Sequence, residues 1–254
     1  MSLHFRPAHH HLEFMAPLSG YRATELVQFV AAHAHGTVVD LGCGWAALLL
    51  RLLQMNNRIR AIGIDTDDEG IRHAQQLAAI HGVADRLDLI SGDARVHLPG
   101  PVQGAICIGA SQIWGHATEM NQPLNYAGAL ATLRQLVERG APVVYGEAIW
   151  NTAPTDAAIA HLAGRVDEFV FLPDLIDLAA SSGFAVMQVH EANLDEWDHF
   201  ESGYAAAYAE WLANNRSSHP DYAEVLRRAS SHREAYYRGY RGIMGMAYVC
   251  LLAV

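Results

Sequence analysis

A glycine-rich turn lies between a β-branched run and a leucine-rich stretch in the first quarter of the chain. It reads Gly42-Cys43-Gly44-Trp45-Ala46 and follows residues 37–41, whose apolar, β-branched character predicts a buried strand. Glycine has no Cβ, so the backbone can pass close to a bound ligand, and the small Ala46 lets the following helix lie tight against the strand. A G-x-G turn alone is a weak signal, so its meaning depends on the residues around it.

An acidic residue ends the next predicted strand. Asp65 closes the strand predicted over 59–65 and lies 21 residues beyond Gly44. A carboxylate at this place can accept hydrogen bonds from both hydroxyl groups of an adenosine ribose. The alternative is a helix N-cap, although Asp67 and Asp68 are better placed to cap the helix that follows. Turn and acid together indicate an adenosine-containing cofactor.

A second acidic position follows the third predicted strand. The run Ser91-Gly92-Asp93-Ala94 lies at the carboxyl end of that strand, where open α/β sheets bind ligands. An aspartate there can accept a hydrogen bond from an exocyclic adenine amine. The alternative is a plain turn.

The elements that must position these residues alternate along the chain. Periodicity predicts strands over 37–41, 59–65, 86–91, 105–109, 142–147 and 184–189, and helices over 21–33, 46–55, 67–81, 124–138 and 172–182, and an apolar run closes the chain over 243–254. Such alternation implies crossover connections and a mainly parallel sheet, which is the α/β fold class. We predict one domain in four segments: a helical lead-in over 1–35, a core over 36–190, a helical insertion over 191–240 that caps the sheet, and a final strand over 241–254.

Composition excludes several classes of partner. Seventeen basic residues against twenty-seven acidic ones leave a formal charge of −10, and no basic cluster offsets it, so we expect no nucleic-acid partner. The three cysteines lie far apart in apolar sequence, as is typical of reduced thiols in a cytosolic protein. The longest apolar run, 243–254, is shorter than the ~20 residues of a membrane-spanning helix, and the polar N-terminus is unlike a signal peptide. We therefore expect a cytoplasmic protein with no membrane partner.

Three of these segments resemble the motifs of one family. Residues 38–46, with Asp40 two residues before the first glycine, look like motif I of the class I S-adenosylmethionine-dependent methyltransferases. Residues 63–65 look like that family's second motif and residues 91–94 like its third. Ala46 stands where many members have a third glycine. The resemblance implies a Rossmann-like, mainly parallel seven-stranded sheet with helices on both faces, an antiparallel C-terminal strand and a helical insertion before the last strand.

The resemblance also implies S-adenosylmethionine as the cofactor and methyl transfer to a small molecule as the reaction. In the family, the acid before the glycines contacts the methionine amino end, a role that falls here to Asp40. Asp65 would hold the ribose hydroxyls. The residues expected to contact the cofactor are Asp40, Gly42, Cys43, Gly44, Asp65, Thr66, Asp93, Ala94 and Gly109.

Two other functions remain open on these residues. Residues 42–47 also satisfy the G-x-G-x-x-A form of NAD(P)-dependent oxidoreductases, although such an enzyme would be expected to carry a larger substrate domain. A non-catalytic module that binds S-adenosylmethionine as a sensor or scaffold would carry the same motifs.

The methyl acceptor is expected to meet the loop after the fourth predicted strand. His116 in that loop is a candidate base or orienting donor because imidazole titrates near neutral pH, and the alternative is a loop histidine bound to backbone or water. Glu147 ends the fifth predicted strand and either faces the acceptor as a catalytic carboxylate or caps the next segment. The loop lacks the Asn/Asp-Pro-Pro-aromatic tetrad with which polymer-modifying relatives hold a planar nitrogen, so a small acceptor is expected.

Aromatic and acidic residues could shape the acceptor pocket. The candidates for its wall or lid are Trp114, Trp150, Trp197 and Tyr204, for each of which packing in the core is the alternative. The run 195–201 is acidic and aromatic enough to cage a cationic amine, and the alternative is a solvated helix face. We expect no metal, because no carboxylate precedes Glu119 in the loop and the run 9–11 of histidines is typical of a surface terminus.

Overall fold

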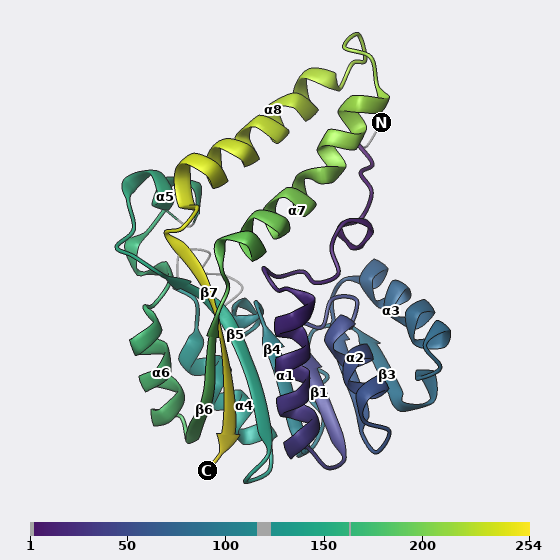
Figure 1. Ribbon diagram of the computed structural model, residues 1–254, viewed down its shortest axis with the longest axis vertical. Helices are drawn as coiled ribbons and strands as arrows, with labels where there is room; N and C mark the ends of the chain where they lie inside the picture. The colour runs from purple at the N-terminus through teal and green to yellow at the C-terminus, as the bar shows by residue number, and fades with distance from the viewer. Residues whose placement is uncertain (1–2, 116–122, 163) are drawn as a thin grey trace. The chain divides into compact units, whose positions relative to one another are not determined.

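One β-sheet organises the part of the chain that the structure describes. The computed structural model describes residues 3–115, 123–162 and 164–254. Within them, seven strands form a sheet in the order β3-β2-β1-β4-β5-β7-β6 (Figure 1). The strands are β1 (Thr37–Leu41), β2 (Arg60–Asp65), β3 (Leu87–Ser91), β4 (Gly104–Ile108), β5 (Pro142–Trp150), β6 (Phe184–Glu191) and β7 (Met244–Ala253).

Strands β1 to β5 pair in parallel, whereas β6 and β7 pair antiparallel at one edge of the sheet. Parallel neighbours need crossover connections, which helices supply here. The helices are α1 (Gly20–His33), α2 (Ala47–Met55), α3 (Asp68–Ile80), α4 (Tyr126–Leu136), α5 (Asp156–His161), α6 (Leu172–Ser181), α7 (Leu194–Asn214) and α8 (Tyr222–Glu234). The predicted Rossmann-like, seven-stranded α/β fold is confirmed.

The described chain groups into two compact units. The core unit comprises Ser19–Ile149, Asp167–Glu191 and Met246–Val254, and so holds α1 to α4, α6 and most of the sheet. The helical unit comprises Met1–Leu18, Trp150–Val166 and Ala192–Gly245, and so holds α5, α7 and α8.

Short polar side chains specify where helices begin. At the start of α1 the Ser19 side chain accepts a hydrogen bond from the Arg22 N–H at 3.3 Å. At the start of α3 Asp67 accepts one from the Glu69 N–H at 3.0 Å. Such caps satisfy backbone N–H groups that have no partner inside the helix. Asp67 is therefore the cap of α3, which leaves the neighbouring Asp65 available for another role.

A large apolar cluster fills the space between the sheet and helices α4 and α6. Alternate residues of a strand point to the same face, so Leu41, Cys107 and Tyr145 all face this cluster and are fully buried. On β1 the residue between Val39 and Leu41 is Asp40, which the same alternation directs to the opposite face. A carboxyl group thus lies inside the protein on an interior strand of the sheet.

The strand order has a switch point between β1 and β4, where the chain connections begin to run to the other side of the sheet. β1 is followed by β2 and β3 on one side, whereas β4 and β5 lie on its other side. Open α/β sheets bind ligands outside the carboxyl ends of the two strands at such a switch point. Here those ends carry Gly42 after β1 and Gly109 after β4.

Two elements differ from the sequence-based expectation. β5 continues to Trp150, three residues beyond the predicted end at Glu147, because all nine of its residues are buried and the glutamate is accommodated inside. Helix α5 was not predicted, since it has only six residues and one fully buried side chain, Ala158, so it shows no apolar period.

Candidate functional site

The turn after β1 has the backbone conformation that its glycines allow. Gly42 and Gly44 have φ angles of +78° and +54°, in the left-handed region that glycine adopts without strain. The N–H groups of Gly42 and Cys43 both donate to the carbonyl of Ile64, at 2.9 and 3.1 Å. A Cβ added at Gly44 would meet no atom within 4 Å, so open space lies beside this residue. The turn is thus fixed to β2 and has an open side.

Ala46 also has a left-handed conformation, with φ of +56°. It is fully buried and immediately precedes α2. A Cβ in this region is strained, so alanine keeps a conformation here that glycine would adopt more easily. Alanine at this position therefore carries a backbone cost that a glycine would avoid.

Asp65 lies directly against the glycine turn. Its Oδ2 accepts a hydrogen bond from the Gly44 N–H at 2.7 Å, and its Oδ1 accepts one from the Asp67 N–H at 2.9 Å. Each carboxylate oxygen has two lone pairs, so each can accept one further hydrogen bond. The carboxylate is therefore held in one orientation while retaining acceptor capacity.

Asp40 is a buried carboxyl group behind the same turn. It is 4% exposed, and burial, followed by repulsion from Asp65, raises its pKa to about 8. Within the described residues, no side chain pairs with it. A buried charge of this kind is costly without a partner, so a cationic group would be strongly favoured beside it.

The carboxyl end of β3 carries the third predicted motif. Asp93 accepts hydrogen bonds from the Arg95 guanidinium, the shortest at 2.6 Å, and from the Arg95 N–H at 2.8 Å. These bonds lower the pKa of Asp93. Gly92 donates to the carbonyl of Asp65 at 2.8 Å, which ties this turn to β2. Of the other two predicted contacts nearby, Thr66 is exposed and Ala94 is buried.

The turn after β4 lies on the other side of the switch point. Gly109 has φ of +62°, is exposed, and has open space beside it, since a Cβ there would meet no atom within 4 Å. Its N–H donates to the carbonyl of Gly146 at 2.8 Å. The next residues, Ser111–Trp114, form a short 3-10 helix. This backbone is therefore well defined up to the start of the loop that holds His116, which lies outside the described residues.

Glu147 is buried beneath that 3-10 helix. It is 4% exposed, and its two oxygens accept hydrogen bonds from the N–H groups of Ser111 and Ala148, each at 2.9 Å. Burial raises the pKa of Glu147, and these hydrogen bonds oppose the rise. The Ser111 hydroxyl is also hydrogen-bonded to the Tyr145 hydroxyl at 2.5 Å. This geometry favours the capping interpretation of Glu147 over an acid or base in contact with a substrate.

Sequence reasoning did not identify Ser111, Tyr145 or Arg95. The position of Tyr145 two residues before Glu147 on one strand was a usable signal, because both side chains must lie on the same face. Ser111 and Arg95 gave no comparable signal, since Ser111 begins a 3-10 helix of only four residues and Arg95 lies in a turn, and neither shows a readable apolar period.

The predicted aromatic residues have different environments. Trp114 packs against the apolar cluster of the core unit, and its Nε1 is buried without a partner among the described residues. Trp150 and Trp197 are 1% and 4% exposed in the helical unit. Tyr204 is 47% exposed and stacks on His232. Trp150 and Trp197 thus have the burial of core side chains, which was the alternative to a pocket wall.

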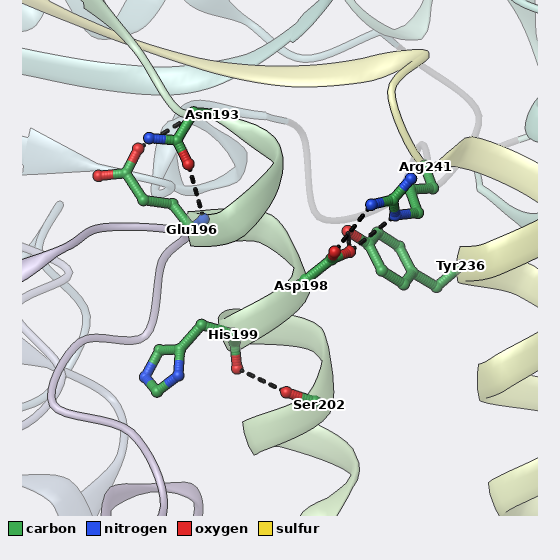
Figure 2. Close-up of polar contacts among 7 residues, drawn as sticks. All are labelled: Asn193, Glu196, Asp198, His199, Ser202, Tyr236 and Arg241. Atoms are coloured by element: carbon green, nitrogen blue, oxygen red, sulfur yellow. Dashed lines mark hydrogen bonds and ion pairs between the residues drawn. The ribbon is translucent and has the colours of Figure 1, made fainter.

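The acidic run of α7 is engaged within the helical unit. Asn193 and Glu196 form a capping box with two hydrogen bonds of 2.9 Å (Figure 2). Asp198 accepts two hydrogen bonds of 2.8 Å from Arg241 and one of 2.7 Å from the Tyr236 hydroxyl (Figure 2). These carboxylates already have partners in the chain, so they do not form an open cage for an amine.

Glu201 joins three elements of the same unit. It is 5% exposed, accepts a hydrogen bond from the Tyr240 hydroxyl at 2.8 Å, and lies 3.0 Å from Nε2 of His232. The hydrogen bond to Glu201 raises the pKa of His232. The acidic run therefore contributes to the cohesion of the helical unit.

No group of three or more histidine, cysteine, aspartate or glutamate side chains in the described part of the chain could hold a metal ion. In the same residues, no helix combines the length and apolar composition needed to cross a membrane.

Comparisons with known proteins agree with this fold. The sequence model of a family described as "Methyltransferase domain" matches residues 32–104, which include the turn and Asp65. The uncharacterized protein YjhP of Escherichia coli (strain K12) is 27% identical over 193 residues, which are 75% of this chain and 73% of that protein.

Two solved structures are similar over almost the whole chain. The SAM-dependent methyltransferase from Thiobacillus denitrificans, in complex with S-adenosyl-L-homocysteine, has a TM-score of 0.81 and 26% identity, covering 97% of this chain and 96% of that one. The SAM-dependent methyltransferase from Geobacter sulfurreducens, also in complex with S-adenosyl-L-homocysteine, has a TM-score of 0.83 and 25% identity, covering 97% and 96%. The fold and these similarities are those of class I S-adenosylmethionine-dependent methyltransferases, and they support S-adenosylmethionine as the methyl donor.

Proposed function

We propose that the core unit binds S-adenosylmethionine at the turn after β1 and that the enzyme transfers the methyl group to a small-molecule acceptor. The observation that carries this proposal is the contact between Asp65 and the Gly44 N–H, at 2.7 Å. It aligns a carboxylate beside an open stretch of glycine backbone, which suits the two hydroxyls of a ribose.

The amino-acid end of the cofactor is assigned to Asp40. Its carboxyl group is buried, and its pKa of about 8 reflects the cost of a charge without a cation beside it. The ammonium group of a methionine tail would supply that cation and lower the pKa. The turn formed by Gly42, Cys43 and Gly44 would then contact the methionine and ribose portions.

The adenine is assigned to the turn after β3, with Thr66, Asp93 and Ala94 as its neighbours and Gly109 on the other side of the switch point. Asp93 is paired with Arg95 on the exposed surface, where solvent screens an ion pair and leaves it a small contribution. An adenine amine can therefore compete for this carboxylate at small cost.

The acceptor is assigned to the region after β4. Methyl transfer is an in-line displacement at a sulfonium, so the residues there need to align the nucleophile and exclude water. Trp114, which lies at the end of the described part of this segment, is proposed as an apolar wall, and His116 as the base or orienting donor. Two features favour a small acceptor over a nucleic acid or a protein amide. The chain has a formal charge of −10, and the loop after β4 lacks the Asn/Asp-Pro-Pro-aromatic motif that holds a planar nitrogen.

Calorimetric titrations with S-adenosylhomocysteine and NADH test the cofactor assignment. We expect the protein to bind S-adenosylhomocysteine and not NADH. Binding of NADH alone would instead support the oxidoreductase that the G-x-G-x-x-A spacing left open.

A screen with a labelled methyl donor tests the acceptor class. The panel contains small amines, phenols, carboxylates and thiols, with total protein and RNA as polymer acceptors. We expect label to appear in a small molecule. Transfer to polymer only would overturn the acceptor class, and binding of the donor without any transfer would support the sensor or scaffold alternative.

A further inference from the structure

We propose that Glu147 is a positioning residue for the cofactor turn and that it acts by holding residues 110–113 against Gly42. This inference rests on the proposed binding of an adenosyl cofactor at the turn after β1. It assigns to the only charged residue of β5 a role that involves no proton transfer to or from the acceptor.

Both oxygens of the Glu147 carboxylate accept hydrogen bonds from backbone N–H groups. Oε1 accepts from the Ala148 N–H and Oε2 from the Ser111 N–H, each at 2.9 Å, and only 4% of the residue is exposed. Ser111 is itself fully buried and is held a second time through its hydroxyl, which is 2.5 Å from the Tyr145 hydroxyl. Two strand residues of β5 thus fix the position of one residue in the segment after β4.

The segment held in this way touches the cofactor turn. A Cβ added at Gly42 would lie 2.7 Å from the Cβ of Ala110 and 3.7 Å from Cδ1 of Ile113. Ala110 is the residue immediately before Ser111, so a displacement of Ser111 moves the methyl group that lies on Gly42. The contacts therefore form a continuous path from the Glu147 carboxylate to the glycine turn.

Packing alone does not explain a carboxylate at this buried position, because an apolar side chain would fill the same space. Placing a charge inside a protein is costly unless hydrogen bonds compensate it, and a neutral side chain would avoid that cost. A carboxylate, however, can accept both backbone N–H groups at once, whereas the amide of a glutamine has only one acceptor atom. Glu147→Gln therefore keeps the shape of the side chain, removes the negative charge that strengthens the bond to Ser111, and leaves one of the two N–H groups facing an amide nitrogen.

The test measures S-adenosylhomocysteine affinity by calorimetry for the wild type, Glu147→Gln and Val143→Ala. Val143 is a fully buried apolar residue of the same strand, so its truncation lowers stability without removing a hydrogen bond to the segment 110–113. We expect Glu147→Gln to bind about tenfold more weakly, as for the loss of one charge-assisted hydrogen bond, and Val143→Ala to bind as the wild type does. S-adenosylhomocysteine undergoes no reaction, so the loss of a general base would not change its affinity.

Hydrogen exchange gives a second measurement on the same proteins. We expect amides of the segment 110–113 to exchange faster in Glu147→Gln than in Val143→Ala. Unchanged affinity in Glu147→Gln, or an equal loss in Val143→Ala, would overturn the inference. A wild type that does not bind S-adenosylhomocysteine would instead count against the proposed function.

Ala110→Gly decides the question if Glu147→Gln does not fold. This variant keeps every hydrogen bond of Glu147 but removes the methyl group that lies on Gly42. We expect its S-adenosylhomocysteine affinity to fall several-fold with Ser111 exchange unchanged. Affinity equal to that of the wild type would show that the contact does not transmit the position of the segment.

Discussion

The carboxylate of Asp65 accepts a hydrogen bond from the backbone N–H of Gly44 at 2.7 Å, which joins the tip of β2 to the turn after β1. The other oxygen accepts from the Asp67 N–H at 2.9 Å, so the group is held between that turn and the start of α3. Preorganisation of this kind lowers the cost of ordering the site when a ligand binds.

Replacing Asp65 by alanine is expected to weaken S-adenosylhomocysteine binding by about 1.5 to 3 kcal/mol, because a charged acceptor of ribose hydroxyls is lost. Calorimetry measures the change. Asp67→Ala is the matched control: it removes the cap of α3, at a cost of about 1 kcal/mol in stability, and should leave the affinity unchanged. Equal affinity of Asp65→Ala and the wild type would mean that the ribose assignment is misplaced.

Replacing Asp40 by asparagine is expected to change how stability depends on pH. The folded-state pKa of about 8 lies above the unfolded value, so ionisation disfavours the folded wild type as pH rises from about 4 to about 8. The isosteric amide of asparagine does not ionise. The free energy of unfolding of the variant should therefore rise relative to that of the wild type across this pH range, by at most about 4 kcal/mol at pH 7.

Urea unfolding of the Asp40→Asn protein and the wild type at pH 5, 6, 7 and 8 gives the comparison. The same variant should bind S-adenosylhomocysteine less tightly, because the partner of the ammonium group is lost. A stability difference that does not vary with pH would contradict the burial of an ionisable group at this position.

Replacing Ala46 by glycine is expected to stabilise the protein by about 1 kcal/mol, because a left-handed conformation is costly for a residue with a Cβ. Thermal and urea unfolding measure the effect. Ala47→Gly, at the first residue of α2, should instead destabilise by up to about 0.5 kcal/mol. If both variants lose stability alike, the strain at Ala46 is compensated by its burial.

Replacing His232 by glutamine tests the ion pair with Glu201. The raised pKa of His232 means that its stabilising contribution is fully present below the unfolded pKa of about 6.5 and is lost as pH rises through the folded pKa. The wild type should therefore exceed the variant in stability at pH 6, by at most about 1 kcal/mol, and by less at pH 9. A difference that grows with pH would have the wrong sign for this pair.

The alternation of strands and helices could be predicted from the sequence because the spacing of apolar residues depends directly on local secondary structure. The strand over 37–41 was predicted with the observed bounds, and the edge pair of β6 and β7 also agrees with expectation. Asp65 lies close to the glycine turn because β1 and β2 are parallel neighbours. Asp40 pairs with Gly63, so the carboxyl ends of the two strands lie side by side.

Tertiary structure alone decided how the remaining polar side chains are used. Glu147 and Ser111 lie 36 residues apart, and Asp198 and Arg241 lie 43 apart. Sequence period shows which face a residue occupies but not which distant group comes to lie opposite it. That pairing is set by how whole elements pack, and a buried carboxylate is ionised, capped or catalytic according to the donors that packing brings within hydrogen-bond distance.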